Sequence, residues 1–144
     1  MSKQNTTPLF HLAFPVNDLE STRKFYGSIL NCKIGRELER WVDFDFFGHQ
    51  ITAHFASEDS TTPTNEVDGH KVPVRHFGAI LEWSDWETLA ARLSELDVEF
   101  LIKPYVRFKG EPGEQGTFFI NDPSGNTLEF KSFRNKDMVF EKWR

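Results

Sequence analysis

Residues 121–133 read NDPSGNTLEFKSF, a tight turn followed by a strand, and they decide the fold class. The DPSG tetrapeptide at 122–125 has proline at the second position and glycine at the fourth, as a β-turn favours. Leu128 and Phe130 then alternate with polar residues, which is the period of a half-buried strand. The pattern predicts that Leu128 and Phe130 pack inward. The residues expected on the opposite face are Thr127, Glu129 and Lys131.

The sequence before this strand completes a βαβββ module over residues 74–133. Alternation over 77–81 predicts its first strand, and two short strands are expected at 98–102 and 116–120. Apolar residues at helical spacing predict a helix after the first strand. This helical stripe consists of Trp86, Leu89, Ala90, Leu93 and Leu96.

Residues 8–56 repeat this order of elements. Alternation at 10–16 predicts a strand, and a helical pattern follows between Leu19 and Leu30. Three strand segments come next, at 33–36, 42–46 and 51–55. Each helix begins near a possible capping box. The two boxes are Asn17 with Glu20 and Ser84 with Glu87.

The polar stretch 57–73, SEDSTTPTNEVDGHKVP, separates the two modules and is predicted to be a linker or surface loop. Residues 134–144 form a polar tail that is expected to dock as a helix on the body of the protein or on a partner subunit. We therefore expect one α+β domain spanning residues 1–144. The large apolar residues of the tail are Met138, Val139, Phe140 and Trp143.

Composition excludes several classes of protein. Lys and Arg number 17 and Asp and Glu 22, so the formal net charge is 17 − 22 = −5, which disfavours binding to nucleic acid. The single cysteine, Cys32, rules out an internal disulfide and a cysteine-based zinc cluster. No apolar run approaches about 18 residues, so no membrane span is expected. The stretch from Met1 to Thr7 is polar, and we expect a cytoplasmic protein.

Four metal-capable side chains fall on strand faces turned away from the predicted helices. His11 and His54 do so in the first module, and His76 and Glu129 in the second. If the modules pack about a pseudo-twofold axis, these side chains converge on one cleft. Two imidazoles and a carboxylate suit Fe, Mn, Ni or Zn and leave coordination positions open. The alternative for each is a structural or solvated residue.

The role of His54 has two readings. It is either a fourth ligand or a catalytic acid–base group near the metal, and we expect the second. The expected distance from the metal is then about 4 to 6 Å, over which a charge still shifts a neighbouring pKa.

Four further residues are candidates for substrate binding. Trp41 and Asp43 alternate with apolar residues and are expected to line the same cleft. Arg107 suits an anionic aromatic substrate, with an ordinary surface arginine as the alternative. Lys131 shares a face with Glu129 and is expected to pair with it or with the substrate. Residues 109–116, KGEPGEQG, are either a plain connector or a lid over the cleft.

Three stretches resemble the vicinal oxygen chelate superfamily, which includes glyoxalase I, extradiol dioxygenases and bleomycin- or fosfomycin-resistance proteins. They are HLAFPVNDLESTRKFYGSILNCKIGR at 11–36, VRHFGAIL at 74–81 and NDPSGNTLEFKSF at 121–133. The resemblance implies two βαβββ modules that pair into a cupped mixed sheet around a divalent metal, with helices on the outer face.

The resemblance assigns His11, His76 and Glu129 to metal-ligand positions. Glyoxalase I has a further ligand from the first module, often Glu. This chain has no Glu in that strand, and His54 and Gln50 are the open alternatives.

The activity implied by the resemblance is that of a metal-dependent enzyme that chelates a small substrate through two neighbouring oxygens. A His, His, Glu trio is closer to the extradiol dioxygenase pattern, which favours an iron(II) dioxygenase, with Mn, Ni or Zn as the other ions. A glyoxalase-like lyase or isomerase is one alternative. A non-catalytic protein that binds a drug or metabolite is another. The apolar tail and the free sheet edges further predict a homodimer.

Overall fold

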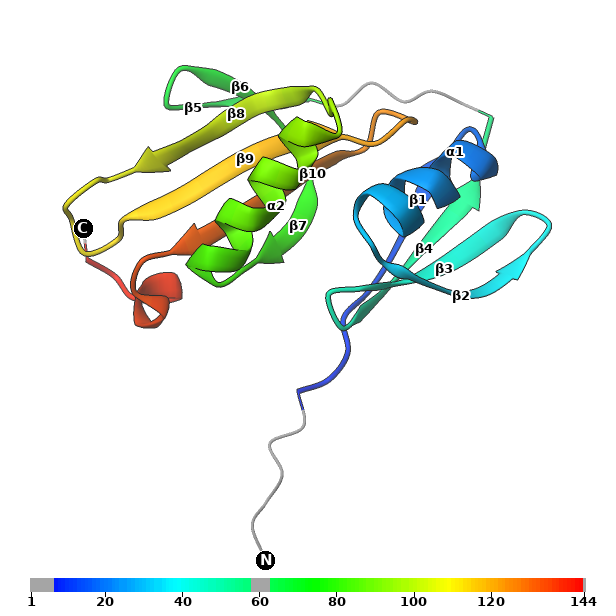
Figure 1. The fold of residues 1–144 in the computed structure, drawn as a ribbon, viewed down its shortest axis with the longest axis horizontal. Helices are drawn as coiled ribbons and strands as arrows, with labels where there is room; N and C mark the ends of the chain where they lie inside the picture. The colour runs from blue at the N-terminus through cyan, green and yellow to red at the C-terminus, as the bar shows by residue number, and fades with distance from the viewer. Residues whose placement is uncertain (1–6, 58–62, 144) are drawn as a thin grey trace, which may run out of the picture. The chain divides into compact units, whose positions relative to one another are not determined.

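The computed structural model describes residues 7–57 and 63–143, and the chain divides into two compact units, Met1–Glu58 and Asp59–Arg144 (Figure 1). Each unit contains a four-stranded mixed sheet and a helix, so the predicted α+β class is confirmed. Most of the polar N-terminal segment and residues 58–62 of the predicted linker lie outside the described residues. None of the helices within the described ranges has the length and apolar character needed to cross a membrane.

The first unit has the predicted βαβββ order. Its sheet has the strand order β1-β4-β3-β2, in which β1 and β4 are parallel and the other neighbours antiparallel. The elements are β1 (His11–Val16), α1 (Leu19–Arg23), a π-helical continuation η1 (Lys24–Ile29), β2 (Lys33–Leu38), β3 (Trp41–Phe46) and β4 (His49–Phe55).

An aromatic cluster fills the space between the helix and the sheet of the first unit. Tyr26 is fully buried, and its ring centroid lies 5.5 Å from that of Phe14 and 5.1 Å from that of Phe44. Alternation along β1 buries Phe14 and Val16 and leaves His11 exposed. The predicted facing of this strand is therefore confirmed.

The second unit repeats the topology with the strand order β7-β10-β9-β8, in which β7 and β10 are parallel. Helix α2 packs on one face, where the Trp86 indole N–H donates to the Phe130 carbonyl at 2.9 Å. Gly116 makes room for this ring, because a Cβ there would lie 2.7 Å from it. The elements are β7 (Phe77–Ile80), α2 (Trp83–Glu95), β8 (Phe100–Arg107), β9 (Gln115–Asn121) and β10 (Thr127–Phe133).

Both helices begin at residues other than the predicted caps. Asp18, not Asn17, caps α1, and its carboxylate accepts a hydrogen bond from the Ser21 amide at 2.9 Å. Helix α2 begins after Glu82, whose side chain makes no capping bond, two residues before the predicted Ser84. Adjacent polar residues compete for a cap, and the sequence pattern alone does not rank them.

A β-hairpin replaces much of the predicted loop. Strands β5 (Thr64–Val67) and β6 (His70–Pro73) are antiparallel and joined at Asp68 and Gly69, which both have positive φ. The prediction of a loop was wrong here because the segment is polar except for two valines. One of them, Val72, is buried against Ile102 and Phe119 of the main sheet. The division of the chain into modules at 57–73 stays a prediction.

The tail forms a short 3₁₀ helix, η2 (Lys136–Val139), and then docks on its own unit. The Trp143 ring lies edge-on to Phe108 at 5.1 Å and covers Gly113, where a Cβ would come within 2.2 Å of the indole. Phe140, in contrast, is 95% exposed. The tail therefore docks on the body of the protein, as one of the two expectations had it, and mainly through Trp143.

Candidate functional site

The strongest candidate site in the second unit is a histidine–carboxylate pair. His76 lies just before β7, and Glu129 lies on the neighbouring strand β10, on the face turned away from α2. The imidazole Nε2 is 3.1 Å from Glu129 Oε1. Their side chains are 28% and 17% exposed, so solvent reaches both. Two of the three predicted ligands are thus in direct contact.

The imidazole of His76 is oriented by the backbone. Its Nδ1 lies 2.7 Å from the carbonyl oxygen of Pro73, which only accepts, so Nδ1 must carry a proton and donate. If the ring is neutral, Nε2 carries no proton. Nε2 and the Glu129 oxygen are then two hydrogen-bond acceptors facing each other. A cation is required between them, either a proton or a metal ion.

Hydrogen bonding keeps Glu129 ionised. Burial works against the charge, but hydrogen bonds from His76 and Thr117 outweigh it and lower the pKa of Glu129. The Thr117 hydroxyl donates to Oε2 at 2.5 Å. The hydrogen bond to Glu129 raises the pKa of His76 in turn, against the opposing effect of burial. Thr117 orients the carboxylate through this hydrogen bond, as residues hydrogen-bonded to metal ligands do, and the sequence pattern did not identify it.

A glycine allows this close approach of strands. A Cβ at Gly78 would lie 1.5 Å from the Glu129 carbonyl oxygen, so no other residue fits beside Glu129. The site is therefore built into the parallel β7–β10 pair.

In the first unit, the strand register places Gln50 beside His11. His11 of β1 pairs with Gln50 of β4, whereas His54 pairs with Pro15. Four residues along a strand span about 13 Å, so the expected position of His54 close to a metal at His11 is not supported. Gln50, the other alternative for the missing glutamate, lies directly opposite His11, whereas the residue that corresponds to Glu129 in this register is Thr52.

Asp43 lies on β3, on the same sheet face as Gln50, and is hydrogen-bonded to residues of β4. Its Oδ1 accepts from the Thr52 hydroxyl at 2.6 Å, and its Oδ2 accepts from the Gln50 amide at 3.3 Å. Asp43 and Gln50 line a cavity of about 350 Å³ together with His49. Trp41 lies at the other end of β3, opposite His54. The predicted substrate residue Asp43 thus borders a cavity, whereas Trp41 is absent from its lining.

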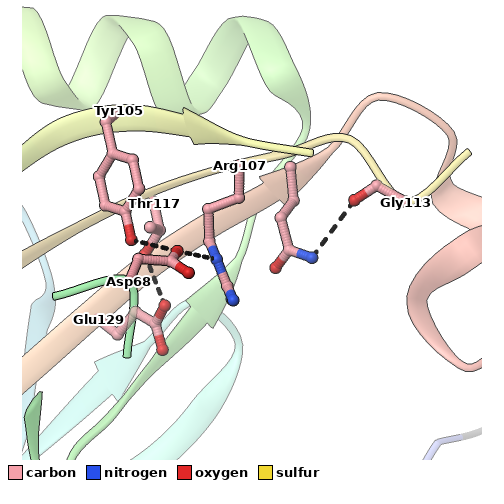
Figure 2. A network of polar contacts seen from close by, with 7 residues as sticks. Asp68, Tyr105, Arg107, Gly113, Thr117 and Glu129 are labelled. Atoms are coloured by element: carbon pink, nitrogen blue, oxygen red, sulfur yellow. Dashed lines mark hydrogen bonds and ion pairs between the residues drawn. The ribbon is translucent and has the colours of Figure 1, made fainter. Parts of the chain in front are cut away.

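The two basic candidates of the second unit have protein partners. Arg107 Nε donates to Asp68 Oδ2 at 2.5 Å, and the same oxygen accepts from the Tyr105 hydroxyl at 2.9 Å (Figure 2). Lys131 lies over the ring of Phe133, with its Nζ 5.5 Å from the centroid. Sequence reasoning missed Asp68 and Tyr105, and the Asp-Gly pair of the hairpin turn was the only local signal for the former.

Residues 108–114 connect β8 and β9, and the last two residues of the 109–116 segment, Gln115 and Gly116, begin β9. The Gly110 amide donates to Glu114, whose carboxylate also accepts from Arg134 at 3.0 Å. These bonds fasten the segment to its own unit, which supports the connector reading over the lid.

Within the described parts of each unit, no three His, Cys, Asp or Glu side chains lie close enough together to hold a metal ion. His76 and Glu129 nevertheless fit one, because the histidine tautomer is fixed by Pro73 and the carboxylate is ionised and backed by Thr117. The pair thus offers one nitrogen and one oxygen donor, two of the ligands that a divalent transition metal would take.

Comparison with known proteins agrees with the motifs. The glyoxalase/bleomycin resistance protein/dioxygenase superfamily matches residues 9–130. A glyoxalase/bleomycin resistance protein/dioxygenase from Alicyclobacillus acidocaldarius is 32% identical, with a TM-score of 0.77 over 96% of this chain and 100% of that one.

Two more distant structures share the fold. The fosfomycin resistance protein FosX from Listeria monocytogenes is 19% identical, with a TM-score of 0.68 over 93% of this chain and 99% of that one. Lactoylglutathione lyase from Agrobacterium tumefaciens is 16% identical, with a TM-score of 0.62 over 90% and 96%. The chain therefore belongs to the glyoxalase/bleomycin resistance protein/dioxygenase superfamily, the vicinal oxygen chelate proteins that its motifs resemble.

Proposed function

We propose that this protein is a metal-dependent enzyme that binds a small substrate through two neighbouring oxygens. His11, His76 and Glu129 are the proposed ligands of one divalent ion. The observation that carries the proposal is the His76–Glu129 contact, in which ring nitrogen Nε2 and a carboxylate oxygen lie 3.1 Å apart and share a proton that a divalent ion would replace. Membership of the family supports it independently.

The residues of the chain have separate tasks in this proposal. Pro73 fixes the ring orientation of His76, and Thr117 fixes that of Glu129. A bound divalent ion supplies a Lewis acid that polarises substrate oxygens. Lys131 lies on the same face of β10 as Glu129 and adds a positive charge that favours an ionised substrate oxygen.

The first candidate activity is an iron(II) dioxygenase. Two histidines and one carboxylate are the ligand set of many non-haem iron oxygenases, in which the remaining coordination positions serve substrate and oxygen. Mn, Ni and Zn suit the same donors.

The second candidate is a glyoxalase-like lyase or isomerase. The observation that favours it is the pairing of Gln50 with His11, because an amide oxygen there offers a fourth ligand. Four protein ligands leave two octahedral positions, enough for a bidentate substrate but not for oxygen as well. His54, which the sequence predicts to be the acid–base group, lies four residues from Gln50 along β4.

One experiment separates these candidates. The protein is purified without chelator, its metal content is measured, and it is loaded anaerobically with Fe²⁺. Oxygen uptake in the presence of catechol supports the dioxygenase. Exchange of the carbon-bound protons of hydroxyacetone in heavy water, without oxygen uptake, supports the isomerase or lyase.

The third outcome is a protein that binds no divalent ion. That result would contradict the metal-dependent proposal and favour the non-catalytic binding protein. His54→Ala is a matched control. It removes an exposed imidazole that lies four residues along β4 from Gln50, the residue paired with His11.

The homodimer is part of the proposal as well. The second unit exposes Phe140 almost completely, which supports an interface at the tail. Light scattering is expected to give about 34 kDa, twice the mass of one chain. A mass near 17 kDa at micromolar concentration would contradict it. A cytoplasmic location remains a prediction.

A further inference from the structure

The β5–β6 hairpin lies against the sheet face that carries Glu129. Val67 and Tyr105 pack on the small cluster formed by Val72, Ile102 and Phe119. Phe119 pairs directly with Glu129 in the register of β9 and β10, so the two share one face. The hairpin therefore covers the sheet beside the proposed ligand.

The tip of the hairpin is held by a single carboxylate oxygen. Oδ2 of Asp68 accepts from the Tyr105 hydroxyl and from Arg107 Nε. Tyr105 pairs with Thr117 across β8 and β9, and Thr117 donates to Glu129. Figure 2 shows Tyr105, Arg107, Thr117 and Glu129 on the same side of the sheet, with Asp68 among them.

Asp68 offsets the positive charge of Arg107, its ion-pair partner on this face. Lys131 contributes a second positive charge, and Glu129 is paired with His76. Without Asp68, Arg107 would face the site with its charge unmatched. Arg107 and Asp68 are 23% and 39% exposed, so a dissolved anion has access to both.

The spacing of β8 and β10 decides whether an anion bound at Tyr105 and Arg107 can also approach the proposed metal site at Glu129. Adjacent strands are about 4.8 Å apart, so β8 and β10 are separated by about 10 Å. Long side chains from both strands reach into that interval. Along the strands, Arg107 is level with Phe133, four residues from Glu129, whereas Tyr105 is level with Lys131, two residues from it. A small molecule whose carboxylate binds Tyr105 and Arg107 can therefore extend toward Glu129 from the Tyr105 side.

We propose that Tyr105 and Arg107 form a carboxylate-binding subsite, that Asp68 occupies it in the free protein, and that the carboxylate of the substrate displaces Asp68 and releases the hairpin. The inference rests on the proposed function in one respect, the use of Glu129 as a ligand. It names the substrate class as a small carboxylate with a neighbouring oxygen.

Asp68 also has a simpler role, as a residue of the hairpin turn. An Asp-Gly pair is favoured in two-residue turns because both positions take positive φ. Asn is as suitable there, so Asp68→Asn keeps the turn while removing the charge. This substitution distinguishes an occupied anion site from a turn residue.

The test measures binding of salicylate to metal-free protein by the fluorescence of the ligand. If Asp68 occupies the subsite most of the time, its removal raises apparent affinity by the inverse of the open fraction. We expect Asp68→Asn to bind salicylate roughly tenfold more tightly than the native protein. Arg107→Gln is expected to lose the binding. Neutral salicylamide is expected not to bind either protein.

Glu66→Gln is the matched control, since it removes one negative charge from the same hairpin. Its affinity for salicylate is expected to equal that of the native protein. Equal affinity of Asp68→Asn and the native protein would overturn the proposal, and so would an equal gain in Glu66→Gln, which would indicate a general charge effect.

Hydrogen exchange supplies a second readout. Salicylate is expected to accelerate exchange of the amides in 64–73 of the native protein, because the hairpin loses its contact with β8. Unchanged or slower exchange would contradict displacement of Asp68. Because no metal is present, loss of the metal proposal would leave these results intact, and the converse also holds.

Discussion

The two sheets of this protein share one topology and differ on the face turned away from their helices. In the second unit that face carries the His76–Glu129 pair, and the β5–β6 hairpin packs on it. In the first unit it carries Asp43 hydrogen-bonded to Thr52 and Gln50, beside a cavity. The backbone order β-α-β-β-β thus supports two unlike polar arrangements.

The strand registers show where the two arrangements diverge. Glu129 pairs with Gly78, and Thr52 pairs with Ala13. If His11 and His76 are equivalent, Thr52 is the counterpart of Glu129. The first unit has its carboxylate one strand further over, on Asp43. Among the residues that the structure describes, the second unit alone forms a histidine–carboxylate ion pair.

The largest effect is expected for Gly78→Ala. A Cβ would overlap the Glu129 carbonyl, so β7 and β10 must separate, at a cost of about 3 kcal/mol or more in the free energy of unfolding. The reverse change in the first unit, Ala13→Gly, is expected to cost about 0.5–1 kcal/mol. Urea denaturation measures both. Equal costs would show that the parallel pairs of the two units are packed alike.

Metal binding is expected to stabilise the protein by a comparable amount. A divalent ion at 100 times its Kd adds about 2.7 kcal/mol to the free energy of unfolding. Thermal denaturation with and without Mn²⁺ measures the shift in Tm. His76→Ala is expected to abolish the shift and His54→Ala to preserve it. A shift that survives in His76→Ala would move the site away from the second unit.

A smaller effect is expected at the helix caps, which also differ between the units. Asp18→Ala removes a side-chain capping bond and is expected to lower Tm by about 3 °C. Glu82→Ala removes no cap and only an exposed ion pair with Lys136, so Tm is expected to change by less. The prediction fails if Glu82→Ala is the more damaging of the two.

The smallest effect concerns alkaline pH. Burial, and then the hydrogen bond to Asp68, raise the pKa of Tyr105 to about 12. Because the folded state holds this proton more tightly, its contribution is complete below about pH 10 and is lost as the pH rises through 12. Tm is therefore expected to fall more steeply between pH 10 and 12 in the native protein than in Tyr105→Phe. Parallel curves would contradict the coupling.

Much of the fold followed from the sequence because alternation reports which side of a strand is buried. It correctly predicted that Phe14 is buried and that Glu129 lies on the sheet face turned away from the helix. It could not give the register between β1 and β4, which depends on pairing rather than facing. Gln50 and His54 share a face, so alternation could not say which of them adjoins His11.

Contacts between segments far apart in the chain also could not be predicted from the sequence. Asp68 and Arg107 are 39 residues apart, and the hairpin that carries Asp68 has few apolar residues. The hairpin was therefore expected to be a loop. His76 and Glu129 were correctly placed on one face, yet the carbonyl of Pro73 and the hydroxyl of Thr117, which orient them, have no sequence signature.

The central claim is that the second unit, through Glu129, holds a divalent metal. The most direct test is calorimetric titration of Mn²⁺ into chelator-treated native protein, Glu129→Gln and Asp43→Asn. The two variants each replace one carboxylate with an amide on the corresponding face of the two sheets. We predict one ion per chain in the native protein and in Asp43→Asn, with affinity reduced by more than about 100-fold in Glu129→Gln. Unchanged affinity in Glu129→Gln, or its loss in Asp43→Asn instead, would contradict the account.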